Sequence, residues 1–257
     1  MISTDRLRDK WVVITGATSG IGKACAELFA EAGSNLIITG RRQERLESLK
    51  KDFEEAHSVK VEISSFDVRD RQACIRFVDD LSHPVDILIN NAGLAVGKDP
   101  VDVAEFEDWD RMIDTNVKGL LNMTRLIAPG MKERNSGHII NIGSIAGHEA
   151  YAGGVVYCAT KHAVDAITKS TKKDLHGTAI RVSSVSPGLV ETEFSNVRLK
   201  GDDEGADKVY EGMEPLTGRD IGEIILFMAS RPDHVNIMDS IVYPVKQSAA
   251  TMVDRSR

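Results

Sequence analysis

The sequence has few cysteines, and their arrangement excludes two kinds of site. The three cysteines, Cys25, Cys74 and Cys158, are scattered and odd in number, so they form neither a disulfide framework nor a metal-binding cluster. The seven histidines show no metal-ligand spacing either. We therefore predict no metal site, and we expect the cysteines to be small buried residues in a reducing compartment.

Long apolar runs and clusters of basic residues are also missing. No stretch of about 18 consecutive apolar residues occurs, so the sequence predicts a protein without a membrane-spanning helix. The first residues, MISTDRLRDKW, carry charges where a secretory signal has its apolar region, which predicts a cytoplasmic protein. The formal net charge is −7, and no basic cluster offsets it, which argues against a nucleic-acid partner.

Strand-like and helix-like segments alternate along the chain, without an internal repeat or a linker. Segments rich in β-branched residues lie at 11–16, 35–40, 59–68, 85–93, 137–144, 179–188 and 240–245. Most are continuously apolar, as in strands covered on both faces. Their alternation with helical segments predicts a parallel sheet. We predict one α/β domain over residues 1–257, a Rossmann-type doubly wound sheet of about seven strands with helices on both faces.

Residues 189–216 interrupt this alternation. The segment is rich in charge and glycine and follows the carboxyl end of a predicted strand. Long irregular segments in compact domains are usually lids or flexible loops. The position at a strand end favours a substrate lid over a solvated surface loop.

A glycine-rich segment at 15–22 follows the first predicted strand and opens a helix. Its glycines allow a sharp turn and the close approach of a pyrophosphate, which the N–H groups and dipole of the helix N-terminus attract. Such a turn alone is a weak signal, but its place between a strand and a helix favours a nucleotide site. The predicted cofactor-binding residues of this segment are Gly16, Thr18, Ser19, Gly20, Ile21 and Gly22.

Two arginines, Arg41 and Arg42, end the second predicted strand, where an NAD-dependent enzyme places an acidic residue for the ribose 2′-hydroxyl. Guanidinium groups bind a 2′-phosphate through charge-assisted hydrogen bonds and offer no acceptor to that hydroxyl. The alternative, two surface arginines at a helix start, is disfavoured because positive charge there needs a compensating anion. The sequence predicts NADP(H) as the cofactor.

Further cofactor contacts are predicted at the carboxyl ends of the next two strands, the edge where open α/β sheets bind ligands. Asp67 and Val68 are candidates for the adenine edge. Asn90, Asn91 and Ala92 are candidates for the ribose.

Ser144, Tyr157 and Lys161 form a candidate reaction centre. Tyr157 and Lys161 are four residues apart in a helical pattern and therefore share a helix face. A tyrosine, with its pKa of about 10, is a poor base at neutral pH, and a neighbouring cation favours the phenolate and lowers that pKa. Ser144 can hydrogen-bond a substrate oxygen beside the tyrosine. Together with the nucleotide segment, this set predicts a hydride-transfer enzyme.

These motifs together resemble the short-chain dehydrogenase/reductase family over essentially the whole chain. The motifs are TGxxxGxG at 15–22, NNAG at 90–93, DTNVKG at 114–119, a serine at 144, YxxxK at 157–161 and PG at 187–188. The resemblance implies a catalytic tetrad of Asn116, Ser144, Tyr157 and Lys161. Tyr157 is the expected acid/base, Lys161 the ligand of the nicotinamide ribose, and Asn116 the holder of a water that links Lys161 to solvent.

The resemblance implies further contacts to the cofactor. Tyr157 and Lys161 are expected to bind it as well as to act in the reaction. The nicotinamide end is expected to contact Pro187, Gly188, Val190 and Thr192.

A narrower resemblance is to the bacterial and fungal NADP-dependent 3-hydroxy acid dehydrogenases. It rests on the segments TGRRQERL, NAGLAVG, MIDTN, YAGG at 151–154 and EFSNVRLKGD at 193–202. It implies the oxidation of L-allo-threonine, L-serine and other 3-hydroxy acids, the reduction of malonic semialdehyde, and a homotetramer.

The substrate is the least determined part of this interpretation. A 3-hydroxy acid carries a carboxylate, so its pocket needs a cation or a donor. Arg198 is the candidate, acting beside Ser144 and Tyr157, with Lys200 a weaker one and a solvated arginine the alternative. Another small aldehyde such as sulfoacetaldehyde, or an uncharged ketone, remains open. A non-catalytic NADP-binding sensor or scaffold is disfavoured by the complete tetrad, and the reaction direction is not encoded.

Overall fold

A seven-stranded parallel sheet forms the centre of the molecule, in the order β3-β2-β1-β4-β5-β6-β9. The computed structural model describes residues 4–256. The strands are β1 (Trp11–Ile14), β2 (Asn35–Gly40), β3 (Val61–Ser65), β4 (Ile87–Asn90), β5 (Gly137–Ile142), β6 (Ile180–Pro187) and β9 (Asp239–Val242). Every neighbouring pair is parallel. Each predicted strand segment overlaps one of these strands, and the predicted α/β fold is confirmed.

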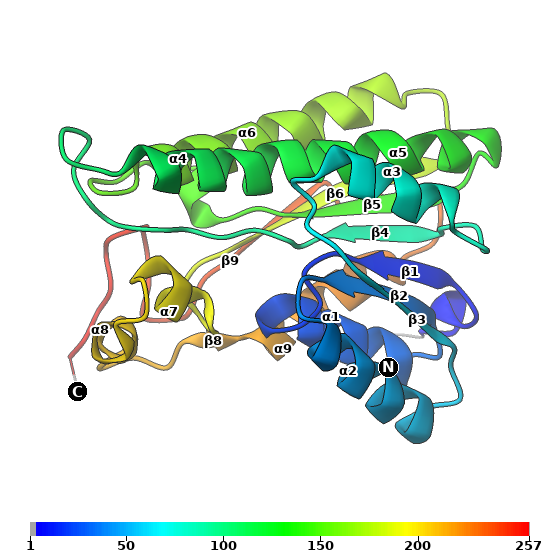
Figure 1. The fold of residues 1–257 in the computed structure, drawn as a ribbon, viewed down its shortest axis with the longest axis horizontal. Coiled ribbons are helices and arrows are strands. Elements are labelled where there is room, and N and C mark those ends of the chain that lie inside the picture. Colours follow the sequence, from blue (N-terminus) through cyan, green and yellow to red (C-terminus); the bar gives the residue numbers. More distant parts are fainter. Residues whose placement is uncertain (1–3, 257) are drawn as a thin grey trace.

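Helices cover both faces of the sheet (Figure 1). Helices α1, α2 and α9 lie on one face, and α3, α4, α5 and α6 lie on the other. The helices are α1 (Gly20–Glu31), α2 (Gln43–Ala56), α3 (Arg71–Asp79), α4 (Phe106–Ile113), α5 (Leu120–Glu133), α6 (Val155–Asp174), α7 (Phe194–Arg198), α8 (Asp203–Lys208) and α9 (Gly218–Ala229). Shorter turns are η1 (Asp5–Leu7), the π-helical η2 (Asp114–Gly119) and η3 (Ile145–Gly147).

The continuously apolar strands follow from burial on both faces. Successive side chains of a strand point to opposite faces. In β1, Val12 and Ile14 therefore belong to the core shared with Phe29 of α1, whereas Val13 belongs to the core shared with Met123 of α5. All five side chains are fully buried.

The strand order reverses between β1 and β4. From β1 the chain builds outward to β2 and β3 and then crosses back to add β4 on the other side of β1. Open α/β sheets bind ligands in the crevice at the carboxyl ends of the strands where this reversal occurs. The fold thus brings the glycine-rich segment after β1 beside the residues that follow β4.

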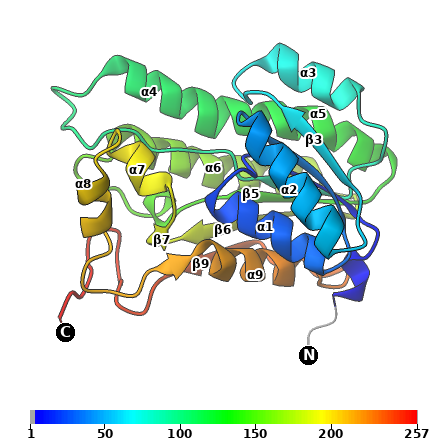
Figure 2. The ribbon, with the colours of Figure 1, turned by 60° about the horizontal axis from the view of Figure 1, so that its bottom comes forward.

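Residues 189–216 are more regular than their composition indicates. They contain α7 and α8, and their ends carry β7 (Val190–Glu191) and β8 (Leu216–Thr217), which pair in parallel. Figures 1 and 2 both show α7 and α8 beyond one end of the sheet, beside the C-terminal segment. We refer to residues 189–216 as the α7–α8 segment.

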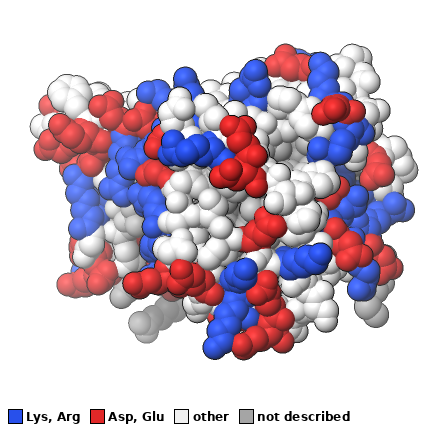
Figure 3. Space-filling model, turned by 45° about the vertical axis from the view of Figure 1, so that its right-hand side comes forward, with Lys and Arg blue, Asp and Glu red and all other residues white. Residues whose placement is uncertain are grey.

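The surface and the cysteines agree with the composition. Lys and Arg lie interspersed with Asp and Glu on the face shown in Figure 3. The three cysteines are buried and unpaired, as expected. None of the helices in residues 4–256 has the length and apolar character needed to cross a bilayer. In the same part of the chain, no group of side chains is suited to hold a metal ion.

Candidate active site

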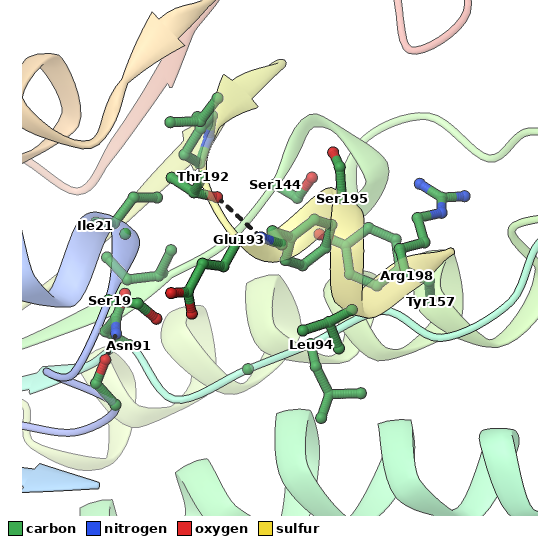
Figure 4. Close-up of a pocket in the computed structure, with 18 of the residues that line it drawn as sticks. Ser19, Ile21, Asn91, Leu94, Ser144, Tyr157, Thr192, Glu193, Ser195 and Arg198 are labelled. Atoms are coloured by element: carbon green, nitrogen blue, oxygen red, sulfur yellow. Dashed lines mark hydrogen bonds between the residues drawn. The ribbon is translucent and has the colours of Figure 1, made fainter. Parts of the chain in front are cut away.

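A cavity of about 540 Å³ opens at the carboxyl ends of the central strands. Its wall is formed by the residues that follow β1 to β6 and by the α7–α8 segment. The volume is in the range of small-molecule sites. Figure 4 shows Tyr157 and Arg198 at one end of the cavity and Ser19 and Asn91 at the other, so the reaction centre and the nucleotide segment share one space.

The glycine-rich segment has the backbone that a pyrophosphate site requires. Gly16 and Gly20 have φ angles of +66° and +53°, a region that side chains disfavour. A Cβ on Gly16 would lie 2.9 Å from the Cα of Ala92. Helix α1 begins at Gly20, and the side chain of its N-cap residue, Ser19, makes no capping hydrogen bond. The N-terminal N–H groups of α1 therefore lack that partner and suit a phosphate.

Gly22 differs from the other predicted residues of this segment because it does not line the cavity. A Cβ at Gly22 would come within 2.5 Å of the Gly16 carbonyl oxygen. Its role is to let α1 pack closely on the glycine-rich segment. Gly16, Thr18, Ser19, Gly20 and Ile21 all line the cavity.

The two arginines after β2 line the cavity but make different contacts. Arg42 donates from Nε and Nη2 to Thr18 Oγ1 at 3.0 and 2.8 Å, and from Nη2 to Ser19 Oγ at 2.8 Å. Its Nη1 donates to Glu193 Oε2 at 2.8 Å. Arg41 is more exposed and lies 3.9 Å from Asp67 Oδ2. Both guanidinium groups line the cavity and are partly exposed to solvent, so a 2′-phosphate can reach them.

Asp67 and Val68 line the cavity next to these arginines. Arg69 donates to both carboxylate oxygens of Asp67, at 2.7 to 3.0 Å. Partial burial raises the pKa of Asp67, but the hydrogen bonds from Arg69 and the charges of Arg69 and Arg41 outweigh it and lower the pKa. The Asp67 carboxylate is therefore ionised and paired at neutral pH.

The asparagines after β4 divide between the cavity and the core. Asn91 and Ala92 line the cavity, and Asn91 Nδ2 donates to the carbonyl oxygens of Thr15 and Gly16 at 2.8 and 3.0 Å. Asn91 thus fixes the glycine-rich segment.

Asn90, predicted to lie near the ribose, has its side chain outside the cavity. The Asn90 side chain is buried and donates to Thr124 Oγ1 and Asn141 Oδ1, both at 2.9 Å. As the last residue of β4, Asn90 points from the sheet into the layer of α5, and it does not line the cavity.

The fold brings Ser144, Tyr157 and Lys161 together. Ser144 follows β5, and its hydroxyl oxygen accepts from the Ala146 N–H at 3.1 Å. Tyr157 and Lys161 lie on one face of α6 and are only 8% and 7% exposed. Lys161 Nζ donates to the Ile142 carbonyl oxygen at 2.8 Å and lies 5.9 Å from the centroid of the Tyr157 ring. The three side chains line the cavity beside one another.

The sequence predicts a lowered pKa for Tyr157, and the structure differs from this expectation. Burial raises the pKa of Tyr157 above its ordinary value, and the neighbouring Ser144 side chain only partly offsets this rise. Burial also lowers the pKa of Lys161 to about 8. Both side chains are removed from water, and burial is the largest cause of both pKa shifts.

Asn116 lies in the π-helical turn η2, a local distortion that often marks functional sites. Its Oδ1 accepts from the Leu94 N–H at 2.8 Å, and its Nδ2 donates to the Leu94 carbonyl oxygen and to Thr160 Oγ1 at 2.8 and 3.0 Å. Asn116 is buried and does not line the cavity itself. A Cβ on Gly93 would lie 3.3 Å from Asn116 Oδ1 and 3.7 Å from Lys161 Nζ, so the two side chains border the same small space.

The end of β6 and the start of the α7–α8 segment supply the residues expected at the nicotinamide end. Pro187, Gly188, Val190 and Thr192 all line the cavity. A Cβ on Gly20 would lie 3.2 Å from the side chain of Thr192. The segment therefore lies against the glycine-rich segment.

Arg198, the predicted substrate residue, lines the cavity close to the reaction centre. Its guanidinium carbon lies 5.8 Å from the centroid of the Tyr157 ring, and Nη1 donates to the Tyr151 hydroxyl at 3.1 Å. Among the acidic side chains that the structure describes, none pairs with Arg198. Lys200, the weaker candidate, pairs with Asp108 at 2.7 Å.

Several cavity residues have no counterpart among the predicted site residues, and three of them contact or lie near predicted ones. They are Tyr151, Glu193 and Phe194, whose ring centroid lies 5.7 Å from that of Tyr157. Tyr151 belongs to the YAGG segment of the narrower resemblance. In the structure, Gly154 of that segment leaves the space that the Tyr151 ring fills. Glu193 and Phe194 belong to the segment EFSNVRLKGD of the narrower resemblance, but their place in the cavity depends on how the α7–α8 segment folds back.

Comparisons with known proteins identify the family of this fold and site. The family model described as short chain dehydrogenase matches residues 10–203. The chain belongs to the short-chain dehydrogenase/reductase family. Proteins of this family are oxidoreductases, and the presence of Ser144, Tyr157 and Lys161 in one cavity agrees with that activity.

Within the family, the chain is similar to proteins named as dehydrogenases of 3-hydroxy acids or of serine. The NADP-dependent 3-hydroxy acid dehydrogenase YdfG of Salmonella typhi is 51% identical over 243 residues, which cover 93% of this chain and 96% of that protein. The NADP-dependent 3-hydroxy acid dehydrogenase of Schizosaccharomyces pombe is 44% identical over 256 residues, covering 98% and 99%. The closed form of a serine dehydrogenase complexed with NADP+ superposes with a TM-score of 0.90 at 47% identity, covering 96% of this chain and 100% of that chain.

Proposed function

We propose that this protein is an NADP(H)-dependent oxidoreductase of small 3-hydroxy acids. It interconverts L-allo-threonine, L-serine, 3-hydroxypropionate or a similar acid with the corresponding 3-oxo acid or semialdehyde. The observation that carries the proposal is the position of Arg198, a cation without a described acidic partner, beside Tyr157. The names of the relatives support the same substrate class and the same cofactor.

The cavity lining from Arg41 and Arg42 to the reaction centre would hold the cofactor. The N-terminus of α1 and the hydroxyls of Thr18 and Ser19 hold the pyrophosphate, and the two arginines hold the 2′-phosphate. Residues 187–192 hold the nicotinamide end. A nicotinamide held there would supply the hydride acceptor for oxidation and the hydride donor for reduction.

Tyr157 moves the proton of the reaction. During oxidation the phenol oxygen takes the proton of the substrate hydroxyl, and during reduction it returns the proton to the carbonyl oxygen. Ser144 hydrogen-bonds the same substrate oxygen and keeps it beside Tyr157. Lys161 binds the nicotinamide ribose and favours the phenolate. Asn116, next to Lys161, holds the water that connects the lysine to solvent.

Arg198 fixes the substrate carboxylate. A guanidinium binds a carboxylate with charge-assisted and often bidentate hydrogen bonds. The Tyr151 hydroxyl accepts a hydrogen bond from Arg198 and so orients the guanidinium. Arg198 belongs to the α7–α8 segment, residues 189–216. This segment acts as a lid that brings the cation to the substrate.

A second candidate substrate keeps the chemistry and changes the anion. Sulfoacetaldehyde carries a sulfonate, which a guanidinium binds as well. Rates of NADPH consumption with malonic semialdehyde, sulfoacetaldehyde and a simple uncharged ketone separate these substrates. We expect the highest kcat/KM with malonic semialdehyde. A preference for the uncharged ketone contradicts a role for Arg198 in binding an anion.

The non-catalytic alternative, an NADP-binding sensor or scaffold, makes a different prediction in the same assay. It expects cofactor binding without turnover of any of these compounds. The presence of Ser144, Tyr157 and Lys161 in one cavity favours an enzyme, because a module that only binds gains little from this set.

Homotetramer formation and a cytoplasmic location complete the proposal. Phe106 of α4, Leu121 of α5 and Val155 of α6 are 73%, 43% and 49% exposed, and a contact with another subunit would cover them. The three buried free cysteines suit a reducing compartment. Light scattering of the purified protein tests the oligomeric state, and a monomer contradicts it.

A further inference from the structure

The α7–α8 segment carries an acidic side chain, Glu193, that contacts Arg42 and Arg45. Glu193 Oε2 accepts from Arg42 Nη1 at 2.8 Å, and Oε1 accepts from Arg45 Nη1 at 2.6 Å. Arg45 also donates to the Thr18 carbonyl oxygen at 3.5 Å. Figure 4 shows Glu193 directed toward Ser19 and away from Tyr157 and Arg198. Glu193 thus serves the nucleotide end of the cavity rather than the substrate end.

The contacts of Arg42 show what this carboxylate does there. The Nε and Nη2 donors of Arg42 are occupied by Thr18 and Ser19, and one Nη1 donor is occupied by Glu193. The hydrogen bond from Arg42 and, next, that from Arg45 lower the pKa of Glu193 despite its partial burial. Glu193 is therefore ionised at neutral pH, and its charge compensates guanidinium charge that a phosphate would otherwise meet unpaired.

A 2′-phosphate and the Glu193 carboxylate require the same positive charge. A phosphate monoester carries a charge of about −1.5 to −2 at pH 7. When it binds at Arg42, it lies close to the Glu193 carboxylate, and like charges repel. NAD(H) has a hydroxyl at this position and meets no such repulsion.

We propose that Glu193 is a specificity-determining residue that weakens the binding of NADP(H) relative to NAD(H) by competing with the 2′-phosphate for Arg42. The inference rests on the proposed assignment of Arg41 and Arg42 to the 2′-phosphate. Since Glu193 lies between Thr192, which contacts the glycine-rich segment, and Phe194, which packs near Tyr157, the competing charge is part of the lid itself.

The test measures the dissociation constants of NADPH and NADH from the fluorescence of the bound nicotinamide. In Glu193→Gln, which keeps the hydrogen-bonding shape and removes the charge, we expect NADPH to bind about threefold more tightly, the size of a half-exposed ion pair. NADH affinity should stay unchanged. Glu204→Gln is the matched control, because Glu204 belongs to the same segment but pairs with Lys208; it should change neither constant.

Other outcomes overturn the inference. Unchanged or weaker NADPH binding in Glu193→Gln contradicts the competition, and so does equal tightening of NADPH and NADH. Glu193→Ala removes the charge without adding an amide, and it should also tighten NADPH binding. A thermal melting curve of each variant checks that it is folded.

A further variant distinguishes an error in the proposed role of Glu193 from an error in the assignment of Arg41 and Arg42 to the 2′-phosphate. The double substitution Arg41→Asp and Arg42→Ala should abolish the preference for NADPH. If it does so while Glu193→Gln has no effect, only the present inference is wrong. If the preference survives the double substitution, the phosphate lies elsewhere and both are wrong.

Discussion

The two ends of the cavity are built in opposite ways. At the reaction end, Tyr157 and Lys161 are 8% and 7% exposed and are held by α6 and the strand that precedes Ser144. At the nucleotide end, the side chains of Arg41, Arg42 and Glu193 are 56%, 40% and 47% exposed. Catalytic groups must be fixed by packing, whereas the discrimination of a phosphate from a hydroxyl can rely on charges in contact with water.

This difference predicts how each end responds to substitution. Removal of a buried reacting group abolishes a step that no neighbour can replace. Removal of an exposed charge changes a binding constant by an amount that solvent reduces. Four predictions test the comparison, in order of decreasing expected effect.

Tyr157→Phe should have the largest effect. The variant keeps the ring that packs near Phe194 but lacks the oxygen that accepts and returns the proton. Removal of a general acid/base costs about 10²- to 10⁴-fold in rate, so kcat should fall by that factor while the dissociation constant of NADPH stays the same. Steady-state rates and cofactor titration measure the two quantities. A variant that keeps its turnover contradicts the role of Tyr157.

Lys161→Met should change how stability depends on pH. The folded-state pKa of Lys161 is about 8, below its ordinary value of 10.5. Between these values the unfolded chain binds the proton and the folded chain does not, so this lysine makes stability rise with pH. Through this lysine, the free energy of unfolding should rise by as much as about 3 kcal/mol between pH 8 and 10.5. The Lys161→Met variant should lack this rise.

Urea denaturation of both proteins between pH 7.5 and 10.5 measures this difference. Groups with raised pKa values, such as Cys25 and Tyr157, act in the opposite direction. They are present in both proteins and largely cancel in the comparison. Parallel pH profiles of the two proteins contradict a depressed pKa for Lys161.

Arg41→Asp combined with Arg42→Ala should convert the cofactor preference. The first change supplies an acceptor for the ribose hydroxyl of NAD(H), and both remove donors to the 2′-phosphate. Because both guanidinium groups are partly exposed, we expect the ratio of kcat/KM for NADPH and NADH to fall by about 30-fold. Arg125→Ala, on α5, is a control for the loss of an arginine. Unaltered selectivity in the double variant contradicts the cofactor assignment.

Arg198→Met should produce the smallest of the four effects. The loss of one charged contact to a substrate in an open cavity raises KM by about tenfold. The increase should appear with 3-hydroxypropionate and not with an uncharged ketone, and Arg198→Lys should restore part of the difference. An equal increase with both substrates shows that Arg198 shapes the site without binding the carboxylate.

The fold and the reaction centre were predictable because their signals are local. Strands buried on both faces are continuously apolar, and the glycine-rich segment lies between a strand and a helix, so both are visible in short stretches of sequence. Tyr157 and Lys161 share a helix face by their spacing alone. The cysteines were correctly expected to be buried and free.

The remaining features depend on contacts between distant segments. Asn90 and Asn91 are adjacent in sequence, yet one lies in the core and the other in the cavity, because a strand alternates its faces. The charge network of Arg42, Arg45 and Glu193 joins residues about 150 positions apart along the chain. The electrostatics of Tyr157 required its burial, which helix spacing does not reveal.

The most direct test of the central claim is the oxidation of 3-hydroxypropionate and L-serine, followed by absorbance at the wavelength of the reduced nicotinamide. Wild-type protein and Tyr157→Phe are compared with NADP+ and with NAD+. We predict turnover by the wild type, much faster with NADP+ than with NAD+, and almost none by Tyr157→Phe. Equal rates with the two cofactors, or no turnover of either acid by the wild type, would contradict the account.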